Sequence, residues 1–285
     1  MKYAYYPGCS LHATGLEYDQ STRAALGALD VELEELREWN CCGASSAHAL
    51  DANAAVILAA RNLALAQRTQ RDLVAPCAAC FNRLKTAEHI LKTDPARRAT
   101  LEHALDFYYA DATQILNPID LVVNHIGLKR VRAAVKTPLT DLSVVSYYGC
   151  LLVRPPHITQ FDDPEQPRAL DQLLSAIGAQ PVEWADATHC CGGSLSLTRA
   201  NIVAKLVDDL VAHARAAGAQ IIATACPLCQ INLEMRQTRA AKLPVVYFTE
   251  LMGLAFGLKE SRQWWGKHLI NPRALVSRYS VVAWT

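Results

Sequence analysis

The sequence predicts an α/β protein made of two homologous open-sheet domains of Rossmann-like type, related by a pseudo-twofold axis. Three observations predict this class. Ten cysteines fall into two sets of five with almost the same spacing. Each set is embedded in the same alternation of short apolar segments and amphipathic helical segments, which is typical of open α/β sheets. The 285 residues are also sufficient for two domains of ordinary size.

The internal repeat is defined by a lone cysteine, a CCG sequence and a CxxC sequence. From CCG onward the two copies are offset by a constant 149 residues, whereas the lone cysteines are offset by 141, so the second copy has eight additional residues in its first loop. Neighbouring residues repeat too, since Tyr-Tyr-Pro-Gly-Cys at 5–9 matches Tyr-Tyr-Gly-Cys at 147–150, and Cys-Cys-Gly-Ala-Ser at 41–45 matches Cys-Cys-Gly-Gly-Ser at 190–194. The two sets are Cys9, Cys41, Cys42, Cys77 and Cys80, and Cys150, Cys190, Cys191, Cys226 and Cys229.

In the first copy, residues 2–6 are expected to form a buried strand that ends at the lone cysteine, and residues 31–33 a weaker strand before CCG. A long helix follows. Residues 73–75 form a strand that runs directly into CxxC, a further helix comes next, and a strand-to-helix corner at 119–121 closes the domain. The long helix has one predicted apolar face, formed by Leu50, Ala54, Ile57, Leu58 and Leu65.

The second copy repeats this order, with strands expected at 143–148, 181–184 and 221–224 and a closing corner at 248–251. Gly218 is a plausible end of its long helix. The predicted domains are residues 1–135 and 136–285, the second with a C-terminal extension, joined by a linker within 124–141. Residues 92–115 and 154–170 are expected to be inserted connections. The apolar face of the second long helix is formed by Val203, Leu206, Val207, Leu210 and Ala214.

The cysteines are expected where strands end and helices begin. In open α/β sheets ligands bind outside the carboxyl ends of the strands. Helix N-termini at that edge present N–H groups and the positive end of the helix dipole, which favours thiolates and anionic ligands. The repeat therefore predicts two ligand sites of the same kind.

Composition narrows the classes of function. Lys and Arg total 28 and Asp and Glu total 27, with no long block of like charge, which argues against a nucleic-acid partner. No apolar run approaches the ~20 residues of a spanning helix, and no apolar core of a signal peptide follows the first residue. We therefore expect a cytoplasmic protein with no membrane span. Thiols stay reduced in that compartment, so ten cysteines indicate metal or redox chemistry rather than a disulfide scaffold.

The number of cysteines distinguishes between kinds of metal site. A disulfide between adjacent cysteines is disfavoured, because neighbouring Cα atoms lie about 3.8 Å apart and a relaxed disulfide needs about 4.4–6.8 Å. Structural zinc takes four thiolates and leaves the fifth unused in both copies. An ordinary cubane iron–sulfur cluster also takes four. Two adjacent thiolates suit neighbouring metal atoms of one cluster, so the pattern favours an iron–sulfur cluster that is not an ordinary cubane.

The tandem CCG pattern, with its upstream cysteine and downstream CxxC, resembles the cysteine-rich CCG domain of the heterodisulfide reductase B-subunit family over nearly the whole chain. The resemblance implies one noncubane [4Fe–4S] cluster on each set of five cysteines. It also implies an oxidoreductase subunit that cleaves a disulfide held between the two clusters. The implied partners are a small ferredoxin-like C subunit, a flavin-bearing A subunit and a disulfide substrate. Composition favours the related sulfur-oxidising complexes of bacteria, in which a thiol or lipoyl-type carrier would be the substrate.

Two other classes remain open. The chain resembles electron-transfer iron–sulfur subunits of succinate, lactate or glycolate dehydrogenases, and a zinc-stabilised interaction module has the same cysteine types. The sequence holds no GxGxxG after a strand, no P-loop and no ferredoxin cysteine run, so electrons are expected from a partner.

Few other side chains are candidates for chemistry. Lys267 and His268, in a Trp-rich tail, are possible proton donors. Surface or structural roles are favoured for the remaining charged residues near the cysteines and the corners, which are His12, His48, Arg83, Lys85, Asp120, His189 and Glu250.

Overall fold

The computed structural model describes residues 1–44 and 46–279, so Ser45 of the predicted CCG repeat lies outside the described residues, as does the end of the C-terminal extension. The first half forms a four-stranded parallel sheet of order β2-β1-β3-β4. Its central strand β1 is apolar and buried toward its carboxyl end, which is why it occupies the middle of the sheet. The strands are β1 (Lys2–Tyr5), β2 (Glu32–Glu35), β3 (Leu73–Val74) and β4 (Ile115–Leu116).

The second half forms a second parallel sheet with the equivalent order, β6-β5-β7-β8. Both sheets therefore place the strand before the lone cysteine next to the strand before CxxC. This arrangement confirms the predicted α/β class with two homologous open sheets. The strand expected at 181–184 is shorter and earlier. The strands are β5 (Ser143–Tyr147), β6 (Gln180–Pro181), β7 (Ile221–Thr224) and β8 (Val245–Tyr247).

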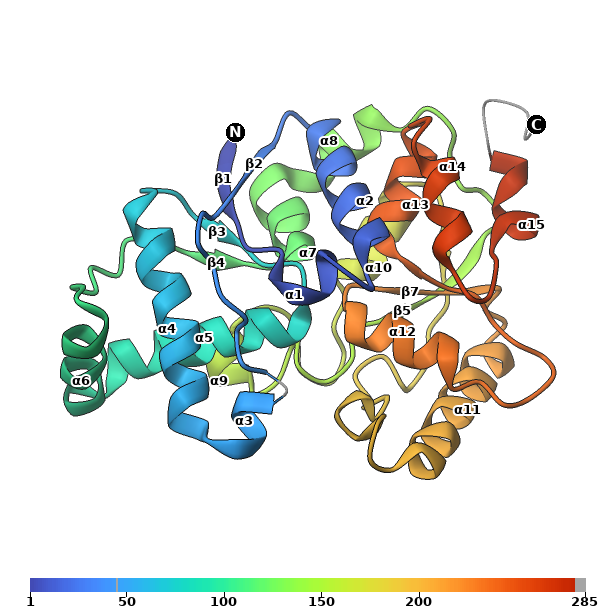
Figure 1. Cartoon of the computed structure of the whole chain (residues 1–285). Helices are drawn as coiled ribbons and strands as arrows, with labels where there is room; N and C mark the ends of the chain where they lie inside the picture. The colour runs from blue at the N-terminus through green and yellow to red at the C-terminus, as the bar shows by residue number, and fades with distance from the viewer. Residues whose placement is uncertain (45, 280–285) are drawn as a thin grey trace.

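Helices of the first half connect and cover its sheet (Figure 1). Asp51 accepts hydrogen bonds from two backbone N–H groups at the start of α4, and Asp94 with a following proline begins α6. The helical elements are α1 (Gly8–Leu11), α2 (Leu16–Gly27), α3 (Ser46–Leu50), α4 (Ala52–Arg68), α5 (Ala78–Thr93), α6 (Pro95–Leu105), α7 (Pro118–Asp120), the π-helical η1 (Leu121–Gly127) and α8 (Leu128–Ala134).

In the second half, Glu250 completes a capping box at the start of α13, which confirms the orienting role expected for this residue. The C-terminal residues form short helical turns against this half (Figure 1). The elements are α9 (Pro156–Thr159), α10 (Ala169–Ala176), η2 (Gly193–Leu195), α11 (Ala200–Ala216), α12 (Pro227–Met235), α13 (Phe248–Ala255), α14 (Ser261–Trp264), η3 (Trp265–Lys267), α15 (Arg273–Val276) and η4 (Ser277–Tyr279).

The two halves pack through reciprocal helix contacts. Helix α2 of the first half lies against α13 of the second, and α10 of the second lies against α7 and η1 of the first (Figure 1). At the α2–α13 contact, the Tyr18 and Tyr247 rings stack with centroids 4.2 Å apart. The Ser21 Oγ and Thr249 Oγ1 atoms lie 2.7 Å apart beside them. Such an exchange of equivalent elements is expected of two domains related by a pseudo-twofold axis.

The predicted buried face of the first long helix is wrong. Leu50 is 88% exposed at the end of α3, and Ile57 on α4 is 38% exposed. The face of α4 that packs inward is formed mainly by alanines, together with Asn62 and Leu63. Small side chains let α4 pack closely against α5, and a periodicity argument weighted toward large residues misses such a face. The second long helix, α11, buries Val203, Val207, Leu210 and Ala214 as predicted, with Leu206 36% exposed.

Candidate functional site

The first set of cysteines gathers at the carboxyl edge of the first sheet. Cys9 lies in α1, which begins just after β1. Cys77 occupies the N-cap position of α5, directly after β3, and Cys80 lies in the first turn of that helix. Cys41 and Cys42 follow β2. Three loops that are far apart in sequence thus bring five thiols to one edge, as the strand order requires.

The second set repeats this placement at the edge of the second sheet. Cys226 occupies the N-cap position of α12 after β7, and Cys229 lies in the first turn. Cys150 follows β5, and the Cys190–Cys191 pair follows β6. In both halves the CxxC cysteines therefore lie at a helix start, as predicted, whereas the CCG cysteines lie in the loop that follows the edge strand.

Within each set the sulfur atoms contact one another. The Sγ atoms of Cys42 and Cys80 are 3.3 Å apart, and those of Cys191 and Cys229 are 3.7 Å apart. The thiols of four further pairs are close enough to alter one another's pKa: Cys41 and Cys42, Cys77 and Cys80, Cys150 and Cys190, and Cys226 and Cys229.

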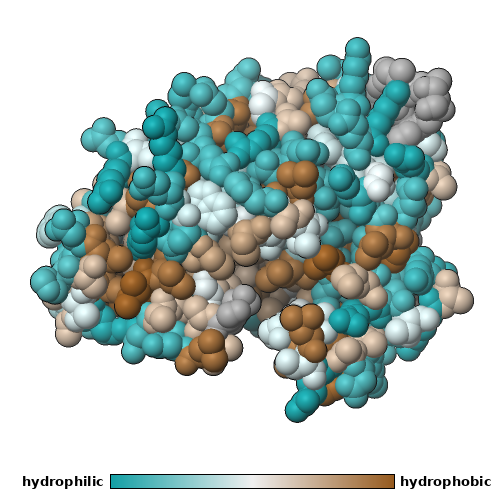
Figure 2. Space-filling view, viewed as in Figure 1, coloured by the Kyte–Doolittle hydropathy of each residue, from teal (hydrophilic) through white to brown (hydrophobic). Residues whose placement is uncertain are grey.

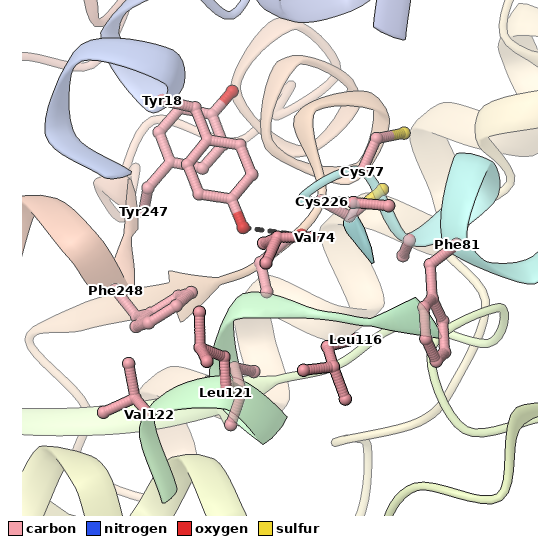
Figure 3. Close-up of a cluster of buried hydrophobic side chains, with 14 of the residues drawn as sticks. Tyr18, Val74, Cys77, Phe81, Leu116, Leu121, Val122, Cys226, Tyr247 and Phe248 are labelled. Atoms are coloured by element: carbon pink, nitrogen blue, oxygen red, sulfur yellow. Dashed lines mark hydrogen bonds between the residues drawn. The ribbon is translucent and has the colours of Figure 1, made fainter. Parts of the chain in front are cut away.

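The two sets also meet. The thiols of Cys77 of the first set and Cys226 of the second lie close enough to alter each other's pKa, and both residues are buried. Figure 3 shows their side chains next to each other, beside the stacked tyrosines. Because each of these residues is the first cysteine of its CxxC sequence, equivalent positions of the two domains face each other at the domain interface.

The Tyr18 hydroxyl group contacts both loops that carry Cys77 and Cys226. This group lies 3.3 Å from the Pro76 carbonyl oxygen and 3.1 Å from the Ala225 carbonyl oxygen. These carbonyl groups belong to the residues that immediately precede Cys77 and Cys226. One buried side chain of the first domain therefore fixes the spacing of both CxxC loops. Sequence analysis gave no signal for Tyr18, because its partners depend on how the domains pack.

A tyrosine and a glycine occupy equivalent positions next to each cysteine set. Tyr6 donates its hydroxyl hydrogen to the Asn40 carbonyl oxygen, and Tyr147 does the same to the carbonyl oxygen of His189, each just before its CCG sequence. Tyr6 and Tyr147 therefore occupy equivalent positions in the two domains. Gly8 and Gly149 have positive φ angles of 68° and 65°. A Cβ atom at either would lie within about 3 Å of a CxxC sulfur, 2.8 Å and 3.0 Å respectively, so both backbones lie directly against the thiols.

The thiols within each set differ in their pKa. Hydrogen bonds from Cys41 and Cys80 lower the pKa of Cys42 to about 3, while the hydrogen bond to Cys42 raises the pKa of Cys41. In the second set, the hydrogen bond from Cys150 lowers the pKa of Cys190 to about 6. Both CCG sequences therefore supply a thiolate near neutral pH, which is the form that binds metals.

One side of the cysteine region is open. Cys9, Cys41 and Cys190 are exposed, whereas Cys42, Cys77, Cys80, Cys191 and Cys226 are buried. Figure 2 shows a notch in this face between the side that carries α3 and the side that carries α11 and α12, with apolar side chains on both borders. A cavity of about 440 Å³ has Cys150 on its wall and is otherwise lined by Leu151, Arg154, Pro155, Pro156, Pro164 and Glu165.

Of the two predicted proton donors, Lys267 is exposed and His268 is buried. The His268 ring lies 3.2 Å from a Glu234 oxygen and 3.0 Å from a Glu250 oxygen, and its Nδ1 lies 3.2 Å from the Gln230 side chain. Burial alone lowers the pKa of His268, but Glu250 and Glu234 outweigh it and raise the pKa to about 11. This group lies directly behind the second CxxC, since Gln230 follows Cys229.

The other charged candidates mostly have partners. His12 pairs with Glu35, His189 pairs with the buried Asp186, and Lys85 pairs with Glu88. Asp186 also binds His213, with 2.6 Å between Oδ2 and Nδ1. Structural roles fit these residues. Arg83 is different, because it lies beside Cys42 and its contacts are with neutral groups.

The donor set fits a multi-iron cluster. Each site offers five thiols, helix N-termini and a glycine backbone packed against a sulfur atom, which leaves room for little except a sulfur-bound group. One pair of sulfur atoms in each set is in contact.

Fold and site together define a duplicated parallel α/β protein with a cysteine-rich ligand site at the edge of each sheet. The family model for the cysteine-rich CCG domain matches residues 3–85 and 144–234. The chain belongs to this family, whose iron–sulfur chemistry the cysteine pattern predicted.

Three relatives show where such chains occur. The chain is 28% identical over 267 residues to the 8-methylmenaquinol:fumarate reductase membrane anchor subunit of Wolinella succinogenes, covering 90% of this chain and 93% of the relative. It is 28% identical over 269 residues to the B subunit of the ferredoxin/F(420)H(2)-dependent CoB-CoM heterodisulfide reductase of Methanosarcina acetivorans, covering 90% and 89%. It is 28% identical over 265 residues to a probable glycolate oxidase iron–sulfur subunit of Bacillus subtilis, covering 90% and 55%.

These similarities confirm the predicted resemblance to the heterodisulfide reductase B-subunit family and imply iron–sulfur clusters. Among solved structures, a hypothetical protein from Helicobacter pylori matches the fold with a TM-score of 0.73 at 13% identity, covering 94% of this chain and 51% of that one. Among the helices that the structure describes, none has the length and apolar character needed to cross a bilayer.

Proposed function

We propose that the chain is the catalytic iron–sulfur subunit of a heterodisulfide reductase-like complex, an oxidoreductase that acts on thiol and disulfide groups between two noncubane [4Fe–4S] clusters. The observation that carries this proposal is the meeting of the two cysteine sets at Cys77 and Cys226 under Tyr18. The proposed ligands of one cluster are Cys9, Cys41, Cys42, Cys77 and Cys80, and those of the other are Cys150, Cys190, Cys191, Cys226 and Cys229.

Two facing sites suit a substrate with two equivalent sulfur atoms. Cleavage of a disulfide to two thiols consumes two electrons and two protons. When bound, each cluster would supply one electron and a metal atom that accepts sulfur. The chain's own residues hold the two sites at one spacing through Tyr18 and leave one side accessible near Cys9, Cys41 and Cys190. Lys267 is the more accessible proton donor, because it is exposed and His268 is buried behind the second CxxC.

The proposed partners follow from the relatives, which are subunits of larger reductases. Electrons would come from a small ferredoxin-like C subunit and a flavin-bearing A subunit, and the substrate would be a thiol, a disulfide or a lipoyl-type carrier. The domain ranges 1–135 and 136–285 and the cytoplasmic location remain predictions.

The test begins with protein expressed with its native neighbours and purified without oxygen. About eight irons with matching sulfide per chain are expected, together with disulfide reduction driven by an artificial one-electron reductant and no activity with a nicotinamide cofactor alone. Stoichiometric zinc with almost no iron and no sulfide would contradict the cluster sites.

A second function is favoured by two of the relatives. The names of the fumarate reductase and glycolate oxidase subunits indicate complexes that do not act on disulfides. The contact between Cys77 and Cys226 would serve equally well as an electron path between two clusters. Fully loaded protein that exchanges electrons with an iron–sulfur partner but leaves every tested disulfide and lipoyl substrate unchanged would favour this electron-transfer function.

A further inference from the structure

One charged side chain distinguishes the surroundings of the two cysteine sets. Arg83 lies on α5, three residues after Cys80, and is half-buried. Its Nη2 atom donates to Asn82 Oδ1 at 3.1 Å, and its Nη1 atom lies 3.2 Å from His48 Nδ1. No carboxylate in the described part of the chain forms an ion pair with it. Burial lowers the pKa of Arg83 and the Cys42 thiolate acts against this, while Cys42 itself contacts Cys80 on the same helix at 3.3 Å.

The equivalent position of the second domain holds a neutral residue. Asn232, 149 residues later, is buried and donates its amide hydrogen to the Cys191 carbonyl oxygen at 2.7 Å. Of the cations near the second set, Arg236 donates to the Ser196 side chain and carbonyl oxygen, and two others pair with carboxylates. Arg154 pairs with Glu165 at 2.8 Å, and His189 pairs with Asp186.

The cation behind the second CxxC has acidic partners. His268 is buried, Glu234 and Glu250 both contact it, and Glu17 is close by. Burial raises the pKa of Glu17, and the other two glutamates add to that increase. The charge of His268 is therefore offset by the acidic side chains around it, which Arg83 lacks.

Charges close to a cluster alter its reduction potential. A cluster held by thiolates becomes more negative when it accepts an electron, and its potential depends on net charge, hydrogen bonds and exposure. A cation without a competing anion favours the reduced state, and half-burial strengthens its effect because the local dielectric constant is lower than in water.

We propose that Arg83 makes the N-terminal cluster easier to reduce than the C-terminal cluster. Where both sites are loaded, an electron held at the second cysteine set would then move to the first across the Cys226–Cys77 contact, which oxidises the second site as it reduces the first. This inference rests on the proposed function, because it requires a cluster on each set.

The experiment is a redox titration of the anaerobic, cluster-loaded protein, followed by electron paramagnetic resonance and visible absorption. Two one-electron transitions are expected. The transition that persists in Cys191→Ser identifies the N-terminal cluster, and in wild-type protein it should lie at the higher potential. Arg83→Gln should lower it by about 59 mV, which is a tenfold change in its one-electron reduction equilibrium, and should leave the other transition in place.

Two control variants test whether charge is the cause. Arg83→Lys keeps the charge and should restore most of the wild-type potential. Arg199→Gln removes an exposed arginine whose hydrogen bond is to the Thr198 carbonyl oxygen, and it should shift neither transition.

The outcomes separate this inference from the function on which it rests. Protein without any iron–sulfur signal would overturn both. Two normal transitions that Arg83→Gln leaves unmoved, or moves together, would overturn the role of Arg83 and leave the cluster sites intact. A wild-type N-terminal cluster at the lower potential would reverse the proposed direction of electron flow.

Discussion

The two cysteine sites are alike in their innermost parts and different in their surroundings. Both have a tyrosine bonded to the carbonyl before CCG, a glycine with positive φ against a CxxC sulfur, and one close Sγ–Sγ pair. Around these, the first site has Arg83 where the second has Asn232. The comparison teaches that duplication kept what holds a ligand, while the environment that sets its properties diverged.

The C-terminal site also has structure that the N-terminal site lacks. The longer first loop of the second domain forms α9, which packs on α5 of the first domain, and Asn82 donates to the Leu151 and Arg154 carbonyl oxygens at 3.0 and 2.8 Å. The tail places His268 behind the second CxxC. The second site is therefore enclosed by elements that also join the domains.

The largest expected effect is the loss of one cluster at a time. Cys42→Ser removes a proposed ligand of the first site and should roughly halve the iron content while the C-terminal signal persists. Cys191→Ser should do the reverse, because the two sets use separate thiols. Iron analysis and electron paramagnetic resonance of anaerobic protein measure both. A variant with both signals unchanged would show that the replaced cysteine is not a ligand.

The glycines test how closely the two sites match. Gly8→Ala and Gly149→Ala both introduce about 1–2 kcal/mol of left-handed backbone strain. The added Cβ atom would lie 2.8 Å from Cys80 Sγ in the first case and 3.0 Å from Cys229 Sγ in the second. Each variant should lose iron from its own site, and Gly8→Ala should lose more.

Gly218→Ala is the control for strain alone. Gly218 has a φ of 89°, and a Cβ atom there would contact nothing within 4 Å. Gly218→Ala should lower the melting temperature and leave the iron content unchanged. Equal iron loss in all three variants would mean that strain, not proximity to sulfur, explains the first two.

Much of the fold and the candidate ligands could be predicted, because both depend on local patterns. Apolar strands that end in cysteine placed both sets at the sheet edges. The buried face of α4 was missed, since its alanines carry a weak hydrophobic signal. Contacts made by domain packing could not be predicted. Tyr18 lies 207 residues from Ala225, and only the reciprocal helix contacts bring them together.

Tyr18 offers a way to disturb both sites with one change. Tyr18→Phe removes the hydroxyl group that bridges the Pro76 and Ala225 carbonyl groups, and should lower the free energy of unfolding by about 1–3 kcal/mol. It should also broaden the spectra of both clusters, because both CxxC loops lose a common anchor. Tyr147→Phe removes a hydroxyl group that donates to the His189 carbonyl oxygen within the second site, and should alter the C-terminal spectrum alone. Spectral change confined to one cluster in Tyr18→Phe would contradict the bridging role.

The smallest expected effect concerns the ionised group behind the second site. The folded-state pKa of His268, about 11, lies above its unfolded value of about 6.5. The folded protein therefore holds more protons than the unfolded chain between these values, and the stability that His268 contributes declines as pH rises through this range, by at most about 1.4 kcal/mol per pH unit.

His268→Gln removes that proton difference, so the melting temperature of the variant should fall less between pH 7 and pH 9 than that of the wild type. His48→Gln, at an exposed ring of the first site, should retain the wild-type dependence. Parallel curves for His268→Gln and wild type would mean that Glu234 and Glu250 do not hold His268 in its charged form.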